Sequence, residues 1–139
     1  MTDFVLDASV ALAWCFTDEA SAAADRLLDR LETENAAVPA IWHFEVANVL
    51  ALSEHRGRIS RAESADFIAR LQVLAIEADE EGSSRAFSQV LDLARDKRLT
   101  AYDAAYVELA MRMGVPLASK DRRLCRAAES LGITVLNAT

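Results

Sequence analysis

The chain has 139 residues, of which 53% are hydrophobic, so it is long enough for one domain with a buried core and too apolar for a disordered chain. Its formal net charge of -7 argues against a general nucleic-acid coat protein but allows a local basic rim. Cys15 and Cys125 lie far apart, which excludes a small disulfide scaffold and favours a reducing compartment. No apolar run approaches the roughly 18 residues of a membrane span, and the N-terminal segment lacks the basic region of a signal peptide. We therefore expect a single cytoplasmic domain over residues 1–139, without membrane association.

Short apolar segments alternate with amphipathic ones along the chain. Strands are predicted at 3–8, around 37–38, and at 75–78, 115–119 and 133–138. Helices are predicted at 17–32, 41–55, 60–74, 83–97, 100–113 and 122–132. The starts and ends of several helices carry the usual signals: Thr17 or Asp18 as a cap, Ser60 with Glu63 at capping-box spacing, and Gly114 as a stop. The alternation predicts an α/β fold with a short parallel central sheet and helices on both faces.

Two acids follow predicted strands. Asp7 comes directly after the apolar residues 4–6, and Asp121 follows the strand 115–119 closely. In open parallel sheets, ligands bind beyond the carboxyl ends of the strands. We therefore expect Asp7 and Asp121 to be neighbours in space, although they are far apart in the chain.

Two further acids lie on predicted helices among apolar residues, whereas surface acids normally occupy the opposite face. Glu45 lies on the face of 41–55 that we expect to be buried, and Asn48 adds a second polar group to it. Asp103 shares one face of 100–113 with apolar neighbours. The apolar members of the two faces are Ile41, Phe44, Val49 and Leu52 in the first helix, and Tyr106, Val107 and Ala110 in the second.

If Glu45 and Asp103 point inward near the strand ends, they converge with Asp7 and Asp121. Crowded carboxylates repel one another, so at neutral pH such a cluster requires protonation or a counter-ion. Hard divalent cations prefer oxygen ligands, and Mg²⁺ combines one or two carboxylates with waters and substrate phosphates. The pattern favours the hypothesis that these acids hold a metal.

Each acid also has a structural interpretation. Asp7 and Asp121 can each cap a helix that begins directly after it. Asp103 lies three residues after Thr100, so these two residues can form a capping box. Glu45 can point to solvent if its helix is rotated. Capping and metal binding are compatible in one carboxylate, so both interpretations stay open.

The four acids lie in motifs that resemble those of PIN-domain ribonucleases, and more closely those of the VapC-type toxins of bacterial and archaeal toxin–antitoxin pairs. The resemblance runs nearly end to end. The motifs are "VLDASVALAWCFTDE" with Asp7 and Ser9, "VPAIWHFEVANVL" with Glu45, "LTAYDAAYVELA" with Thr100 and Asp103, and "PLASKDRRLCRAAESLGI" with Asp121. Many relatives carry a further acid two residues after the last of these, where this chain has Arg123, so the number of metals per site stays open.

The resemblance implies a PIN-like three-layer fold and an endoribonuclease that depends on Mg²⁺, with Mn²⁺ as a substitute. In this interpretation three acids are the metal ligands: Asp7, Asp103 and Asp121. Glu45 completes the cluster or orients the attacking water, and attack by water leaves a 5′-phosphate and a 3′-hydroxyl. The polar side chains expected to support the carboxylates are Ser9, Thr100 and Asn48.

The resemblance also implies three kinds of partner. These are an RNA substrate, a small antitoxin whose C-terminal segment covers the acidic site, and a second copy of the chain in a homodimer. The candidate dimer surfaces are the segment 17–28 and the helices between Ile41 and Leu74. The basic residues that flank Asp121 are the expected RNA phosphate contacts: Lys120, Arg122 and Arg123.

Two other classes of function are compatible with a small α/β domain. A phospho-acceptor signalling receiver also carries acids and a lysine at strand ends. However, a receiver needs an acid pair after the first strand, and this chain has only Asp7 there. A catalytically inactive PIN-fold interaction module is the other alternative, and the presence of all four acids argues against it.

Overall fold

A five-stranded parallel sheet forms the centre of the protein, in a computed structural model that describes residues 1–139. The strands are β1 (Phe4–Leu6), β2 (Ala36–Val38), β3 (Ile76–Ala78), β4 (Leu117–Ser119) and β5 (Val135–Asn137). They lie side by side in the order β3-β2-β1-β4-β5, so β1 is the middle strand. All four pairings between neighbouring strands are parallel. The order places β1, from the start of the chain, directly beside β4, from near its end.

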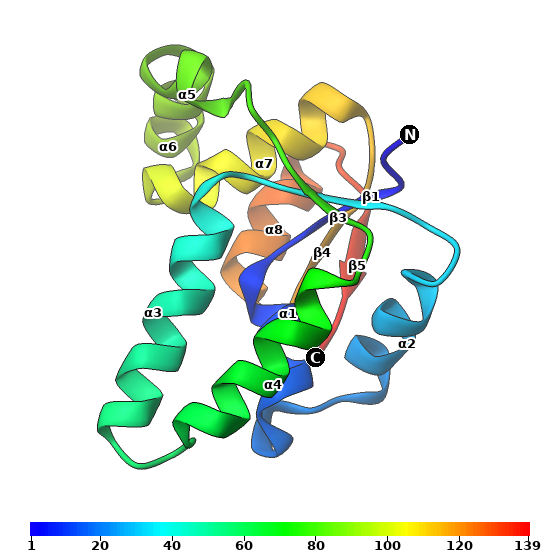
Figure 1. Cartoon of the computed structure of the whole chain (residues 1–139). Helices are drawn as coiled ribbons and strands as arrows, with labels where there is room; N and C mark the ends of the chain where they lie inside the picture. Colours follow the sequence, from blue (N-terminus) through cyan, green and yellow to red (C-terminus); the bar gives the residue numbers. More distant parts are fainter.

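Helices surround the sheet (Figure 1). They are α1 (Ala8–Cys15), α2 (Ala22–Arg30), α3 (Ile41–His55), α4 (Arg61–Gln72), α5 (Gly82–Arg85), α6 (Leu91–Lys97), α7 (Ala101–Met113) and α8 (Arg122–Ser130). A 3₁₀ turn at Thr17–Glu19 precedes α2, and a π-helical stretch at Ala86–Val90 joins α5 to α6. The predicted three-layer α/β fold is confirmed. None of the helices combines the length and the apolar character needed to cross a membrane.

The three inner strands supply the centre of the core. β1, β2 and β4 are buried along their whole length, whereas the edge strands β3 and β5 are partly exposed. A parallel strand covered on both faces cannot alternate apolar and polar residues, which explains the continuous sequences "FVL" and "AAV". The core that these strands form fixes the position of their carboxyl ends.

The pairing of β1 with β4 determines where the chain leaves the sheet. Leu6 lies opposite Ala118, and the backbone N–H of Asp7 donates to the Ala118 carbonyl at 2.9 Å. The residues that follow the two strands therefore emerge together at the same edge, as parallel pairing requires. The helix α7 packs against both strands, and α3 packs against α1. These contacts bring two more helices to that edge.

The first two helices differ from the expectation. Periodicity did not predict α1, because it is apolar on nearly every side and so lacks an amphipathic period; only the alternative role of Asp7 as a cap indicated a helix there. The predicted helix 17–32 is divided: its first residues form the 3₁₀ turn, and α2 begins after Ser21. Ser21 is the true cap, since its hydroxyl accepts the N–H of Ala24 at 3.0 Å. The predicted caps Thr17 and Asp18 were therefore wrong.

The predicted buried face of α3 was also wrong. Phe44 is 74% exposed and Leu52 43% exposed, whereas the residues that enter the core are Trp42, Val46, Leu50 and Ser53. Glu45 therefore lies beside the core-facing stripe rather than on it, and it is half-buried. The predicted helix 83–97 is interrupted by the π-helical stretch. The capping box of Ser60 and Glu63 is confirmed, since both of its hydrogen bonds are present.

Candidate active site

Two serine hydroxyls hold the carboxylate of Asp7 at the end of β1. Ser9 Oγ donates to Asp7 Oδ2 at 2.6 Å, and Ser119 Oγ donates to the same oxygen at 2.7 Å. Each hydroxyl in turn accepts a backbone N–H at 3.0 Å, from Lys120 to Ser9 and from Asp121 to Ser119. Because the serines accept from the backbone, their own protons are directed to Asp7. Oδ2 is therefore saturated and Oδ1 has no side-chain partner.

Asp7 occupies the cap position before α1, but its side chain makes no capping hydrogen bond. The interpretation of Asp7 as a helix cap is therefore wrong. Its carboxylate is buried, with 7% of its surface exposed, and none of its side-chain partners is a cation. A buried carboxylate without a cation is costly, so Asp7 has no evident purpose as a structural group alone.

Asp121 caps a helix with one carboxylate oxygen and leaves the other oxygen open for a metal. Its Oδ1 accepts the N–H groups of Arg123 at 2.9 Å and of Leu124 at 3.2 Å, which caps α8. The capping role is therefore confirmed. Oδ2 makes no hydrogen bond and the residue is exposed, so the other half of the carboxylate is open to solvent at the sheet edge.

Asp103 lies in the first turn of α7. Thr100 caps this helix, and its Oγ1 accepts the N–H of Asp103 at 3.1 Å. The carboxylate does not return a hydrogen bond to the backbone of Thr100, so only half of the predicted capping box forms. Asp103 is half-buried and has no ion-pair partner. The capping interpretation explains Thr100 but leaves the carboxylate of Asp103 unexplained.

Glu45 reaches the site from α3. The hydroxyl of Tyr106 donates to Glu45 Oε1 at 2.5 Å, which connects α3 to α7 across the site. Asn48, one turn further along α3, is exposed and makes no hydrogen bond to any of the four acids. It does not support the carboxylates in this structure, in contrast to the prediction.

The pKa values show that the acids act on one another. Burial raises the pKa of Asp7, and the charge of Asp121 raises it further, against the lowering effect of the two serine hydrogen bonds. Burial also raises the pKa of Asp103, and the charges of Asp121 and Asp7 add to this effect. Burial raises the pKa of Glu45, with smaller contributions from Asp7 and Asp103. The structure therefore brings the four acids predicted from sequence into one region of negative potential.

The donor atoms fit a hard divalent cation. Every candidate ligand is a carboxylate oxygen, and neither Asp7 Oδ1 nor Asp121 Oδ2 accepts a side-chain hydrogen bond. No group of three or more acidic, histidine or cysteine side chains lies close enough together to hold a metal ion by itself. Mg²⁺ does not need such a group, because it keeps several waters and binds through one or two carboxylates. The arrangement suits a cation bound partly through water.

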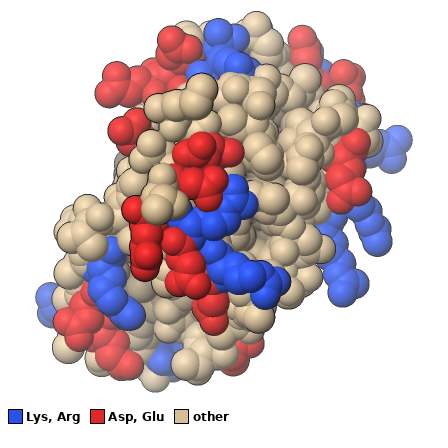
Figure 2. Space-filling view, turned by 90° about the vertical axis from the view of Figure 1, so that its right-hand side faces the viewer, with Lys and Arg blue, Asp and Glu red and all other residues tan.

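The three basic residues predicted to contact RNA have different environments. The ammonium of Lys120 donates to the carbonyl of Glu19, and Arg123 Nη2 donates to the carbonyl of Arg98 at 2.8 Å. Arg122 is exposed and has no partner. On the face drawn in Figure 2, acids and bases are interspersed and form no continuous basic surface.

Sequence reasoning missed two groups, Ser119 and the hydroxyl of Tyr106. Ser119 is two residues before Asp121 at the end of β4, and this spacing from a candidate acid was the available signal. Tyr106 is one helical turn after Asp103, but it was counted only as an apolar neighbour. Both hydroxyls contact acids far away in the chain, so their partners cannot be inferred from local sequence.

The fold and the site define a class: a parallel α/β domain with four acids gathered at the carboxyl edge of its sheet. The PIN domain family model matches residues 4–130. The chain is also 30% identical over 131 residues to Ribonuclease VapC3 of Pyrobaculum aerophilum, an alignment that covers 91% of this chain and 95% of that protein. The chain therefore belongs to the PIN domain family, which confirms the resemblance inferred from its motifs.

Solved structures share the fold. PAE2754 from Pyrobaculum aerophilum superposes with a TM-score of 0.72 at 20% identity, over 97% of this chain and 90% of that one. FitAcB from Neisseria gonorrhoeae gives 0.66 at 19% identity, over 97% of both chains. VapBC2 from Rickettsia felis, bound to a DNA fragment from its promoter, gives 0.69 at 10% identity over 98% of both chains. At these identities the likeness is evidence for the fold alone.

Proposed function

We propose that the chain is a metal-dependent endoribonuclease and acts as the toxin of a toxin–antitoxin pair. The observation that carries the proposal is the gathering of Asp7, Glu45, Asp103 and Asp121 at one sheet edge, in a PIN-family chain whose matched relative is a ribonuclease. The receiver alternative is not favoured, because Asp103 lies in α7 rather than at the end of a middle strand. We treat residues 1–139 as one domain of a cytoplasmic protein.

We propose Mg²⁺ as the metal, replaceable by Mn²⁺, with Asp7, Asp103 and Asp121 as its ligands directly or through water. The bound metal would lower the pKa of a water molecule and neutralise charge on the phosphate under attack. Ser9 and Ser119 keep Asp7 Oδ1 free and fixed in direction. Asp121 contributes Oδ2 while its Oδ1 caps α8. Glu45 accepts a hydrogen bond from the attacking water and orients it toward phosphorus.

We expect the RNA backbone to approach over the start of α8. Arg122 is exposed and unpaired beside Asp121, so it is the strongest candidate for a phosphate contact. Lys120 and Arg123 hold backbone carbonyls of neighbouring loops, and they would support the shape of this rim. The overall negative charge makes such a local contact necessary, because the rest of the surface repels RNA.

We propose an antitoxin as protein partner, in line with the folds shared with FitAcB and VapBC2. A groove of about 370 Å³ lies between α3 and α4, and eight of its ten lining residues are hydrophobic. Such a groove suits the apolar face of a partner helix. The groove is lined in part by α3, the helix that carries Glu45, so a segment bound there could continue across the acids. We also expect a homodimer.

The direct test is cleavage of a mixed RNA preparation by the purified chain, with Mg²⁺, with Mn²⁺ and with excess EDTA. The proposal predicts metal-dependent fragments with 5′-phosphate ends, which mapping of RNA ends would identify. Cleavage at full rate in EDTA would contradict the metal mechanism. Absence of cleavage under every metal condition would favour the inactive interaction module, and labelling by acetyl phosphate would favour a receiver.

A further inference from the structure

Tyr106 is a fully buried tyrosine whose hydroxyl contacts one acid of the site. Its exposed surface is 0%, and its hydroxyl lies 2.5 Å from Glu45 Oε1. The two residues are 61 positions apart and belong to different helices, α7 and α3. Packing alone would be satisfied by phenylalanine at this position. The hydroxyl therefore calls for its own explanation, since a buried polar group is costly unless it is hydrogen-bonded.

The chemistry of the contact makes Tyr106 the donor. Burial raises the pKa of its hydroxyl far above the ordinary value, and the negative charges of Asp7 and Glu45 act in the same direction. The hydroxyl is therefore protonated at neutral pH and is the donor in its contact with Glu45. Glu45 Oε1 is occupied by this donor, and Oε2 has no protein partner.

The position of Tyr106 on α7 adds a second constraint. Asp103 lies three residues earlier on the same helix, one turn away, so the two side chains lie on the same side of α7. A single rigid helix therefore carries one acid of the site and the hydroxyl that holds another acid from α3. Any shift of α7 would move both together, which preserves their spacing.

We propose that Tyr106 is a positioning residue of this site: its hydroxyl holds Glu45 Oε1 so that Oε2 is presented to the attacking water. This inference rests on the proposed ribonuclease function. Tyr106 does not touch the substrate and acts only through Glu45. A hydroxyl that orients a carboxylate in this way has the same role as the groups that hydrogen-bond to metal ligands and orient them. Loss of such an orienting group costs roughly 10–100-fold in activity or metal affinity.

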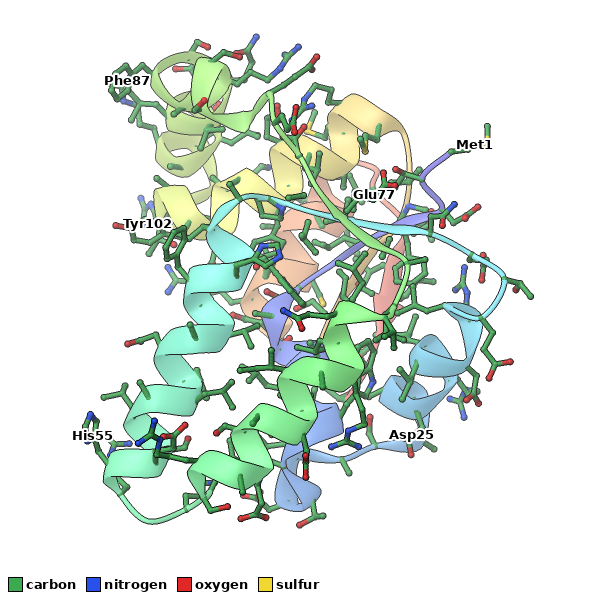
Figure 3. The ribbon with its side chains drawn as sticks, viewed as in Figure 1. Met1, Asp25, His55, Glu77, Phe87 and Tyr102 are labelled. Carbon is green, nitrogen blue, oxygen red and sulfur yellow. The ribbon has the colours of Figure 1, made fainter.

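The chain offers a matched control for this proposal. It contains only two tyrosines, and Tyr102 lies on the same helix but is 61% exposed and points away from the molecule (Figure 3). The hydroxyl of Tyr102 has no hydrogen-bond partner. Tyr106→Phe and Tyr102→Phe therefore each remove one tyrosine hydroxyl from α7. In Tyr106→Phe the lost hydroxyl contacts Glu45, and in Tyr102→Phe it faces solvent.

We expect Tyr106→Phe to lower kcat for RNA cleavage by about 10–100-fold with KM changed less than about twofold, and Tyr102→Phe to have no effect. In a Glu45→Gln background, Tyr106→Phe should cost no further activity, because no carboxylate remains to be positioned. Additive losses in the double variant would mean that Tyr106 acts only through stability, and would overturn the inference. If Tyr106→Phe cleaved RNA at the wild-type rate, the inference would also be overturned. The proposed ribonuclease function would not be affected.

A second measurement keeps the hydroxyl in place and does not depend on activity. In the Tyr102→Phe protein, 3-fluorotyrosine labels position 106 alone, so its ¹⁹F resonance reports on the contact with Glu45. We expect that resonance to move when Glu45→Gln is introduced. An unchanged resonance would contradict the contact itself. A wild type without metal-dependent cleavage would overturn the proposed function, and with it the role of Tyr106, even if the resonance did move.

Discussion

Ser119 joins two acids that are far apart in the sequence. Its hydroxyl donates to Asp7 Oδ2 at 2.7 Å and accepts the backbone N–H of Asp121 at 3.0 Å. The residue is completely buried at the end of β4. One hydroxyl therefore links the carboxylate of β1 to the start of α8, and it fixes the distance between the two acids on neighbouring strands.

The first prediction concerns this link. Ser119→Ala should destabilise the chain by about 1–3 kcal/mol, because the backbone N–H of Asp121 loses its acceptor and the buried carboxylate of Asp7 keeps only the hydrogen bond from Ser9. Cleavage should fall as well, since Asp7 loses one of its two donors. Urea unfolding and RNA cleavage would measure the two effects. Ser130→Ala is the control, because Ser130 is exposed and donates only to the carbonyl of Ala127; an equal loss in both variants would contradict the role of Ser119.

The second prediction concerns the metal ligands. Asp7→Asn, Asp103→Asn and Asp121→Asn should each lower RNA cleavage by about 100-fold or more, because a direct ligand matters at least as much as the groups that orient it. Glu45→Gln should have a similar effect. Asp66→Asn, at an exposed position of α4 without a partner, should leave the rate unchanged. Near-normal cleavage by Asp103→Asn would mean that Asp103 serves only the start of α7.

The third prediction concerns pH. In the metal-free protein the pKa of Asp103 is raised above its ordinary value by burial and by the charges of Asp121 and Asp7. A raised pKa in the folded state means that ionisation of Asp103 destabilises the fold. This penalty is absent below the unfolded pKa and grows as pH rises through the unfolded and then the folded pKa.

Asp103→Asn removes that charge and keeps the shape of the side chain. In EDTA at pH 7.5 the variant should therefore melt at a higher temperature than wild type, and the difference should shrink toward pH 4. Thermal unfolding at both pH values provides the measurement. A variant that is less stable than wild type at pH 7.5 would show that repulsion among the acids does not determine stability here.

The fourth prediction concerns binding of the cation. Mn²⁺ at 100 times its dissociation constant should stabilise the wild type by about 2.7 kcal/mol, which corresponds to a Tm increase of roughly 5–10 °C for a domain of this size. Asp7→Asn should show a much smaller increase, since it loses a proposed ligand. Thermal unfolding with Mn²⁺ and with EDTA would measure both. Equal shifts in the two proteins would place the bound Mn²⁺ elsewhere.

Sequence periodicity predicted the fold well where neighbouring residues decide the structure. The strands before Asp7 and Asp121 were predictable because parallel strands buried on both faces are continuously apolar. The same property concealed α1, whose residues are apolar on nearly every side. In α3 the error arose because Phe44 is exposed although it is aromatic, so composition alone suggested the wrong face.

The acids of the candidate site were predictable because Asp7 and Asp121 follow strands closely and Asp103 interrupts an apolar helix. Their hydrogen-bond partners were less so. Ser9 is close to Asp7 in the chain and could be recognised, whereas Ser119 is 112 positions away from the carboxylate that it contacts. Asn48 shows the converse: it is close to Glu45 in sequence, yet its side chain lies in solvent. Contacts across the sheet depend on topology, which local patterns do not contain.

The position of β1 between β2 and β4 has a consequence for synthesis of the protein. β1 leaves the ribosome long before β4, the strand with which it pairs on one side. Asp7 cannot receive the hydrogen bond of Ser119, 112 positions later, until that residue has emerged. A nascent chain is therefore without its complete acid cluster until β4 and Asp121 have been made, and a ribosome making a nuclease of this design meets no assembled site before that point.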